Sequence, residues 1–343
     1  MKKLLILIMI FIACSCTPSE REQVSNISQT RDIFAMDTYM NLKAYGEDTV
    51  SVLDEAENEI RNLEKMISVT TENSDIWKIN HSAGNYTDVS SDTLEIIETA
   101  IDIGNQTDGN LDITVYPVVR EWGFTTGDYK IPDEQTIESL LKNVDFRQIE
   151  INNNSVRIPP EFQLDVGSLA KGYTGDKVID IFRKNGIESA IINLGGNVQT
   201  LGTKPDGSMW NVAIKNPFQT DSEICILSVE NKAVITSGNY ERFFTGDDGL
   251  NYWHIIDTTD GKPADNGLVS VTIIGENGLL CDALSTALFV AGTEKAIEYW
   301  HKNNDFDMIL VTDDGNIIVT EGIENNIRML SDMTTEVIYH EKN

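Results

Sequence analysis

Positively charged residues are scarce in this chain of 343 residues. Its 26 lysines and arginines stand against 55 aspartates and glutamates, which gives a formal net charge of −29. Such a surface repels a polyanion over most of its area, which argues against nucleic acid as a partner. A ligand that carries phosphate would therefore need a local device, such as a metal ion or a set of backbone amides.

Cysteine and histidine are also scarce, at four residues each. Only Cys225 and Cys281 lie beyond the first 16 residues, which excludes a disulfide framework and leaves a cysteine metal site short of ligands. The few histidines stand mostly in dissimilar polar segments, so a histidine-rich zinc site does not fit either. Hydrophobic residues still make up 41% of the chain, enough for the core of one large domain or two.

A hydrophobic run long enough to cross a bilayer is missing. The apolar run Leu4–Ile12 follows Lys2 and Lys3 and is far shorter than the roughly 20 residues that a membrane span needs, so it indicates an export signal. The run ends at Ala13-Cys14 and Ser15-Cys16, either of which resembles a bacterial lipobox with a lipid-modified cysteine. We therefore expect a signal peptide over 1–16, cleaved before Cys14 or Cys16, a flexible tether over 17–32, and a folded domain over 33–343.

The rest of the chain mixes helical and strand-like segments, and no internal repeat is visible. Apolar spacing predicts helices over 53–67, 91–101, 137–141, 170–184 and 282–302, the last interrupted near Gly292. Strand-like runs cover 190–193, 212–215, 224–229, 233–236 and 269–274, and hairpin turns are predicted at 247–249 and 313–315. Because the two types do not follow a strict βαβ rhythm, the pattern favours an α+β fold.

The segment LDVGSLAKGY, residues 164–173, predicts a junction where a strand ends and a helix begins. Unpaired amides at a helix start favour anions, Gly167 lets a ligand approach, Asp165 offers a carboxylate, and Lys171 could neutralise a phosphate. The alternative is an ordinary turn in which Ser168 caps the helix and the lysine is solvated.

The segment CDALSTALF, residues 281–289, places Asp282, Ser285 and Thr286 on one face at a helix start. Three oxygen donors on one face suit a hard cation such as Mg²⁺. Alternatively, the aspartate favours the helix dipole and the hydroxyls bond to the backbone.

Two further segments fit either a structural or a functional role. In HIIDTTDGKP, residues 254–263, a strand-like run leads into a polar turn, and His254 could be an acid or base or a loop hydrogen-bonding group. In INLGGN, residues 192–197, the paired glycines suit either a tight turn or close approach of a ligand.

Read in order, these segments resemble the ApbE family, the FAD:protein FMN transferases. The resemblance covers nearly the whole chain after its first 35 residues, and eight segments carry it: Met36-Asp37-Thr38, SDIWKIN at 74–80, LDITVYPVVREWGF at 111–124, LDVGSLAKGY, INLGGN, TSGNYER at 236–242, HIIDTTDGKP and CDALSTALF. It implies an α+β, ApbE-like (T-fold-like) fold with mixed sheets and helices and a flavin cleft between two halves.

The resemblance also implies a set of site residues. FAD would be bound by residues that match the family pattern, namely Met36, Leu111, Asp112, Ile113, Asp165, Lys171 and Ile256, with Thr70 at a position where many members carry a flavin-holding tyrosine. Magnesium would be held by Ser168, through its backbone carbonyl, and by Asp282, Ser285 and Thr286. Thr258 replaces a proline of the usual HIIDP pattern, which would change the rigidity of that turn.

The activity implied is a magnesium-dependent transfer of FMN from FAD to a Thr or Ser hydroxyl of a client flavoprotein, through a phosphoester bond and with release of AMP. His254 is the candidate base. A magnesium-dependent FAD pyrophosphatase and a lipoprotein that stores FAD are the alternatives. We expect an exported protein, lipid-anchored to a bacterial membrane and facing the periplasm from the inner membrane, whose client belongs to a membrane redox complex or is another exported flavoprotein.

Overall fold

The computed structural model describes residues 27–340, and the expected signal peptide with Cys14 and Cys16 lies outside them. The described chain begins with strand β1, Ser28–Ala35. Residues 28–32, which the sequence suggests as the end of a tether, therefore belong to the folded domain. They pair with the neighbouring strand, so the domain starts earlier than position 33. Within 27–340 no helix is both long enough and apolar enough to span a bilayer.

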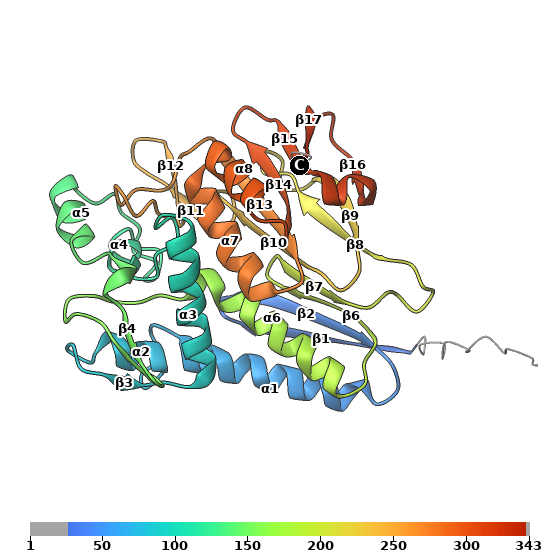
Figure 1. Cartoon of the computed structure of the whole chain (residues 1–343), viewed down its shortest axis with the longest axis horizontal. Coiled ribbons are helices and arrows are strands. Elements are labelled where there is room, and N and C mark those ends of the chain that lie inside the picture. The colour runs from blue at the N-terminus through green and yellow to red at the C-terminus, as the bar shows by residue number, and fades with distance from the viewer. Residues whose placement is uncertain (1–26, 341–343) are drawn as a thin grey trace, which may run out of the picture.

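A nine-stranded sheet forms the centre of the described part of the chain (Figure 1). Neighbouring strands are antiparallel except for the final pair, which is parallel. In spatial order they are β1, β2 (Thr38–Tyr45), β6 (Ser189–Leu194), β7 (Asn197–Leu201), β10 (Ala233–Gly238), β13 (Leu268–Gly275), β14 (Asp307–Thr312), β15 (Ile317–Thr320) and β17 (Thr335–Ile338).

Helices cover one face of this sheet, in front of it in Figure 1. They are α1 (Thr49–Ile67), α3 (Ser91–Gln106), α6 (Gly167–Lys184), α7 (Gly278–Ala291) and α8 (Thr293–Lys302). The apolar spacing within 53–67 that predicts a helix is confirmed, since Leu53, Ala56, Ile60, Leu63 and Ile67 are all buried on α1. One continuous stripe of a helix is thereby buried against strands β1 and β2 and against the neighbouring helix α6.

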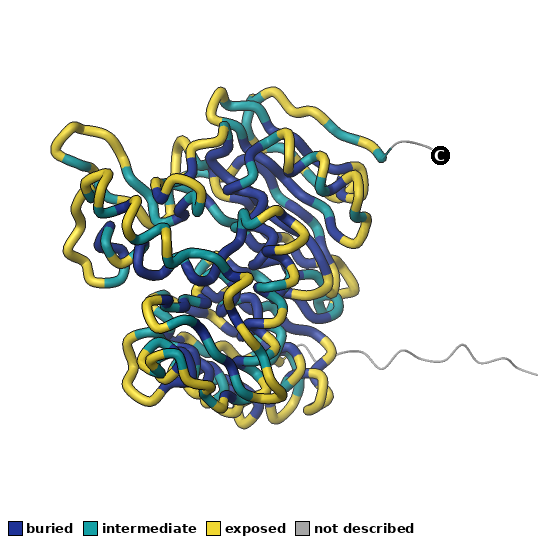
Figure 2. The backbone as a smooth tube through the Cα atoms, turned by 60° about the vertical axis from the view of Figure 1, so that its left-hand side comes forward, coloured by how far each residue is buried: buried dark blue, intermediate teal, exposed yellow. Residues whose placement is uncertain are grey.

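The other face of the sheet packs against a smaller, three-stranded sheet. It consists of β8 (Trp210–Lys215), β9 (Glu223–Val229) and β16 (Ile327–Met329), which follows the 3₁₀ helix η2 (Glu321–Asn326). Successive side chains of β10 point to opposite faces of the sheet, so Ile235 packs with the helices and Val234 packs with the small sheet. Figure 2 shows the buried residues concentrated in these central layers, with exposed residues on the peripheral loops.

A side lobe lies beside these layers, at the left of Figure 1. It contains α2 (Asp75–Asn80), β3 (Thr87–Asp88), α4 (Tyr116–Glu121), α5 (Glu134–Leu141), the 3₁₀ helix η1 (Phe146–Gln148), β4 (Glu150–Asn152), β5 (Ser155–Arg157), β11 (Phe243–Thr245) and β12 (Asn251–Trp253). Part of it has a small core of its own around Trp122 and Phe124. The predicted α+β class is confirmed, with helices and mostly antiparallel strands in separate layers.

Three local predictions are wrong. The helix expected from residue 282 begins at Gly278, so Asp282 lies in its second turn and not at its start. The helix expected from Ala170 begins at Gly167 after a non-strand segment, and Ser168 lies inside it without capping it. The run expected as a strand at 254–257 lies beyond the end of β12 and is irregular apart from one bridge at Ile256.

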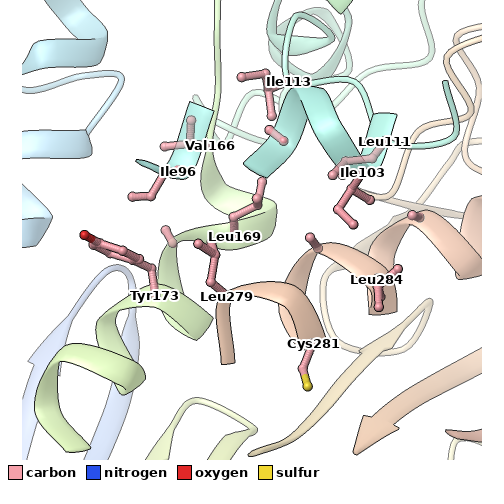
Figure 3. Close-up of a cluster of buried hydrophobic side chains, with 14 of the residues drawn as sticks. Ile96, Ile103, Leu111, Ile113, Val166, Leu169, Tyr173, Leu279, Cys281 and Leu284 are labelled. Carbon is pink, nitrogen blue, oxygen red and sulfur yellow. The ribbon is translucent and has the colours of Figure 1, made fainter. Parts of the chain in front are cut away.

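The crossing of α6 and α7 depends on two glycines. A Cβ atom on Gly172 would lie 2.2 Å from the carbonyl oxygen of Gly278 and 2.6 Å from the Cβ of Asp282. Asp176 of α6 accepts hydrogen bonds from the amides of Gly278 and Leu279 at 2.8 and 2.9 Å, which caps the start of α7. Leu169 and Leu279 pack beside this crossing in the core shared with α3 (Figure 3). The two helices are therefore held with their backbones nearly in contact.

We expect Gly172→Ala to destabilise the protein by about 1 to 3 kcal/mol, because the added methyl group must push the two helices apart. Urea unfolding followed by circular dichroism measures this. Lys184→Ala, at the exposed end of the same helix, is the control and should change stability by less than about 0.5 kcal/mol. Equal stability of the Gly172 variant and the wild type would contradict the close crossing.

Candidate active site

A cavity of about 340 Å³ lies where the side lobe meets the sheet and its helices. Segments far apart in the sequence form its wall: the turn between β1 and β2, residues 110–125, the start of α6, the turn between β6 and β7, the end of β10, residues 254–258, and α7. Its size falls in the range of small-molecule sites. Of the predicted site residues, those that line it are Met36, Leu111, Asp112, Asp165, Ser168, Lys171, His254, Ile256, Asp282 and Thr286.

The start of α6 is shaped by Asp165. Its Oδ1 accepts a hydrogen bond from the amide of Gly167 at 2.7 Å, and its own amide donates to the carbonyl of Ile113 at 2.8 Å. Burial raises the pKa of Asp165, while Arg242 and Lys171 oppose that rise through their charges. Ile113 is buried in the core and does not line the cavity, so its contribution is to hold Asp165 in position.

Asp282 reaches the cavity from α7 across the helix crossing. Its Oδ2 accepts a hydrogen bond from the amide of Gly172 at 2.8 Å, and its side chain is buried. Burial raises the pKa of Asp282, and the nearby charge of Lys171 favours the ionised form. Within the described residues, Lys171 forms no ion pair within 4 Å, so its ammonium is available to an anionic ligand.

The two hydroxyls that follow Asp282 differ in their surroundings. Ser285 is fully buried, does not line the cavity, and donates to the carbonyl of Asp282 at 2.8 Å while also meeting the Oγ of Ser237 at 2.8 Å. Thr286 lines the cavity, and its Oγ1 lies 3.3 Å from Ser237. Thr286 thus faces the cavity, and Ser285 secures the helix behind it.

A magnesium ion fits the donor chemistry of this corner. Asp282 and Thr286 offer carboxylate and hydroxyl oxygens, which are donors that Mg²⁺ prefers, and Ser168 lines the same cavity. Among the described residues no group of three or more His, Cys, Asp and Glu side chains is arranged to hold a metal. With a single carboxylate, the ion would complete its shell with water and ligand phosphate oxygens, which matches a site for a diphosphate.

His254 lines the same cavity and has a lowered pKa. Burial, together with the charges of Arg242 and Lys171, lowers the pKa of His254 to about 4. Its Nδ1 lies 3.2 Å from the carbonyl oxygen of Arg242, which can only accept a hydrogen bond. The neutral ring therefore carries its proton on Nδ1, and Nε2 keeps the lone pair that a base needs.

Three other predicted positions have local structural roles. Asp112 lines the cavity, yet its carboxylate accepts from the amides of Thr114 and Phe146 at 2.8 and 2.9 Å, so it stabilises the loop. Met36 has a positive φ of 50°, and its amide donates to Glu64 at 2.6 Å, which fixes it at the cavity wall. Thr70 is exposed and does not line the cavity, and within residues 27–340 its hydrogen bonds are local ones to Ser68.

Three further lining residues were not predicted from the sequence to form the site, although Thr258 was noted there as a departure from the family pattern. Arg242 lies in the cavity wall and donates to the carbonyl of Phe124, and Thr258 donates to the carbonyl of Gly109 at 3.0 Å. Asn197 is buried in the cavity wall, where its side chain favours the ionised form of Asp282. These residues belong to the segments TSGNYER, HIIDTTDGKP and INLGGN. The order of these segments along the chain indicated that they form the site, but only the fold shows which of their side chains line the cavity.

The ApbE family model matches residues 36–310, which includes every segment of the cavity wall. The chain belongs to the ApbE family. It is 33% identical to a FAD:protein FMN transferase of Klebsiella pneumoniae over 76% of this chain and 82% of that protein. It is 32% identical to the protein of the same name from Vibrio cholerae over 78% and 82% of the two chains.

Solved structures of the family share its architecture. The ApbE protein of Thermotoga maritima superposes with a TM-score of 0.83 at 28% identity and covers 88% of this chain and 100% of its own. The flavin transferase ApbE of Vibrio cholerae gives a TM-score of 0.78 at 27% identity with the same coverage. The expected ApbE fold is thereby confirmed.

The low pKa of His254 predicts how the unliganded protein responds to acid. Because its folded pKa of about 4 lies below the unfolded value of 6.5, the unfolded chain binds more protons between these two values. The contribution of His254 to stability is therefore present above pH 6.5 and lost as the pH falls toward 4. NMR titration of the ring protons, with His254→Gln to assign the signal, should give a midpoint near pH 4. A midpoint near 6.5 would contradict the lowered pKa of this ring.

Proposed function

We propose that this protein is a FAD:protein FMN transferase, which moves FMN from FAD to a hydroxyl side chain of a client flavoprotein. The proposal rests on three groups that line one cavity: the start of α6 with Lys171, the oxygen donors of α7, and a neutral histidine. The first two suit a diphosphate, and the third suits a hydroxyl nucleophile. The names of the relatives point to the same activity.

In the proposed reaction the acceptor oxygen attacks the phosphorus of the FMN half of FAD. A P–O bond forms to that oxygen, the bond from this phosphorus to the bridging oxygen breaks, and AMP leaves. His254 Nε2 takes the proton of the hydroxyl, while the Arg242 carbonyl keeps the ring oriented. The ammonium of Lys171 holds phosphate oxygens at the start of α6.

Asp282 and Thr286, with the carbonyl of Ser168, would hold magnesium, and Ser285 would keep the helix in place. When bound, the ion neutralises charge on the diphosphate and favours departure of AMP. The same residues would also support hydrolysis if water replaced the protein hydroxyl, which is why products must be measured.

We further propose export and lipid anchoring at Cys14 or Cys16 to the periplasmic side of a membrane, on the strength of the N-terminal sequence.

Product analysis tests the proposed activity. The soluble form, without the first 26 residues, is incubated with FAD, magnesium and an exported flavoprotein subunit, followed by chromatography of nucleotides. We expect AMP to appear in equal amount to the FMN bound to the acceptor. Free FMN with AMP would instead identify a pyrophosphatase, and unchanged FAD that stays bound would identify a storage protein.

We expect Asp282→Ala to slow FMN transfer at saturating magnesium by at least about 100-fold, because the only carboxylate of the proposed metal site is lost. Asp180→Ala, at an exposed position on α6, is the control and should transfer at the wild-type rate. Full activity of the Asp282 variant would remove the metal assignment.

A further inference from the structure

A second, larger groove lies beside the cavity and takes no part in the proposed reaction. Its volume is about 980 Å³, and α5, β12 and residues 257–266 form its walls. The apolar and aromatic side chains that line it are Trp122, Ile137, Leu141, Leu250, Tyr252 and Trp253. Leu250 is 61% exposed, although it is a large apolar side chain that would be stabilised by burial.

Carboxylates line the same groove. Glu134, Glu138, Asp257, Asp260 and Asp265 line the groove, against Lys262 as the one basic residue in its lining. Within the described residues none of these five carboxylates takes part in an ion pair within 4 Å. Asp257 and Asp260 accept hydrogen bonds from Thr259 and from the amide of Lys262, but these donors carry no charge. The lining therefore keeps a negative net charge, which favours a basic partner.

The groove and the cavity share a wall. Tyr252 lines the groove and His254, two residues later, lines the cavity, so the backbone separates their Cα atoms by at most about 7 Å. Aromatic contacts connect the two sites: Tyr252 lies 5.4 Å from Phe244, Phe244 lies 5.8 Å from Phe124, and Phe124 lies 6.3 Å from His254, all between ring centroids.

Hydrogen bonds make the shared wall rigid. The indole of Trp122 donates to the carbonyl of Gly261 at 2.8 Å, and the indole of Trp253 donates to that of Ala264 at 3.0 Å. The groove is thus a preformed surface next to the proposed base, which limits the entropy lost when a partner binds.

We propose that this groove binds the client protein through a segment that carries an apolar side chain flanked by lysine or arginine. The inference rests on the proposed transferase function and adds the chemistry of the acceptor. The apolar side chain enters the groove above Tyr252 and Leu250, and the basic residues meet the surrounding carboxylates. The acceptor hydroxyl then lies only a few residues along the chain from the groove.

Peptide binding without FAD tests the proposal. The probe is a fluorescent synthetic peptide that alternates leucine and lysine around one threonine, and its counterpart replaces each lysine by glutamate. We expect fluorescence anisotropy to show that the basic peptide binds the wild type and that added salt weakens binding. The acidic peptide should not bind. Failure of the basic peptide to bind, or equal binding of both, overturns the proposal.

Matched variants locate the binding surface. The pair Glu134→Lys and Glu138→Lys on α5 and, separately, the exposed Leu250→Ser should each weaken peptide binding by about tenfold. The pair Glu98→Lys and Asp102→Lys, with the same spacing on α3, should leave it unchanged. Equal weakening by the α3 pair, or no effect of the groove variants, overturns the proposal.

We expect FAD binding, measured by the quenching of flavin fluorescence, to be the same in every variant. Failure of the proposed transferase function is a separate outcome, because it would appear as loss of FAD binding or of AMP release in the wild type itself.

Discussion

The contact on which the site depends is the close crossing of α6 and α7. Two glycines, Gly172 and Gly278, let the helix backbones approach to a distance that no side chain would allow. Because of that approach, the amide of Gly172 can donate to the carboxylate of Asp282 at the bottom of the cavity. The start of one helix, which favours anions, and the oxygen donors of the next are thereby brought to the same corner. The sheet and the core around Leu169 and Leu279 hold this arrangement in place (Figure 3).

The cavity contains positively charged residues although the chain as a whole is strongly acidic. A chain with a formal net charge of −29 offers little long-range attraction to an anionic nucleotide, so binding depends on charges inside the cavity. Lys171 and Arg242 supply them, and their positive charge also lowers the pKa of His254. One set of cations can therefore hold phosphates and keep the histidine neutral at physiological pH. The acidic groove on the other side of the shared wall has the opposite charge preference, which separates the nucleotide from the proposed basic segment of the client.

Much of the fold could be predicted from local pattern. The buried stripe of α1, the end of α6 at Asn185 and the hairpin turns at 247–249 and 313–315 agree with the structure, because spacing and turn residues determine them. Predictions that needed tertiary information were less accurate. The helix that carries Asp282 begins one turn earlier than expected, since Asn277 and Asp176 cap it and the second is distant in sequence. Likewise, chain order gave the segments of the site, but only packing shows that Thr286 faces the cavity while Ser285 and Ile113 lie behind its wall.

Locating the metal tests the central claim most directly. Crystals grown with FAD and Mn²⁺, a magnesium substitute that scatters anomalously, would show the position of the ion beside the diphosphate. We expect a peak within about 2.0 to 2.3 Å of the Asp282 carboxylate and the Thr286 hydroxyl, next to the start of α6. A peak elsewhere, or FAD bound in the cavity with no ion near Asp282, would contradict it.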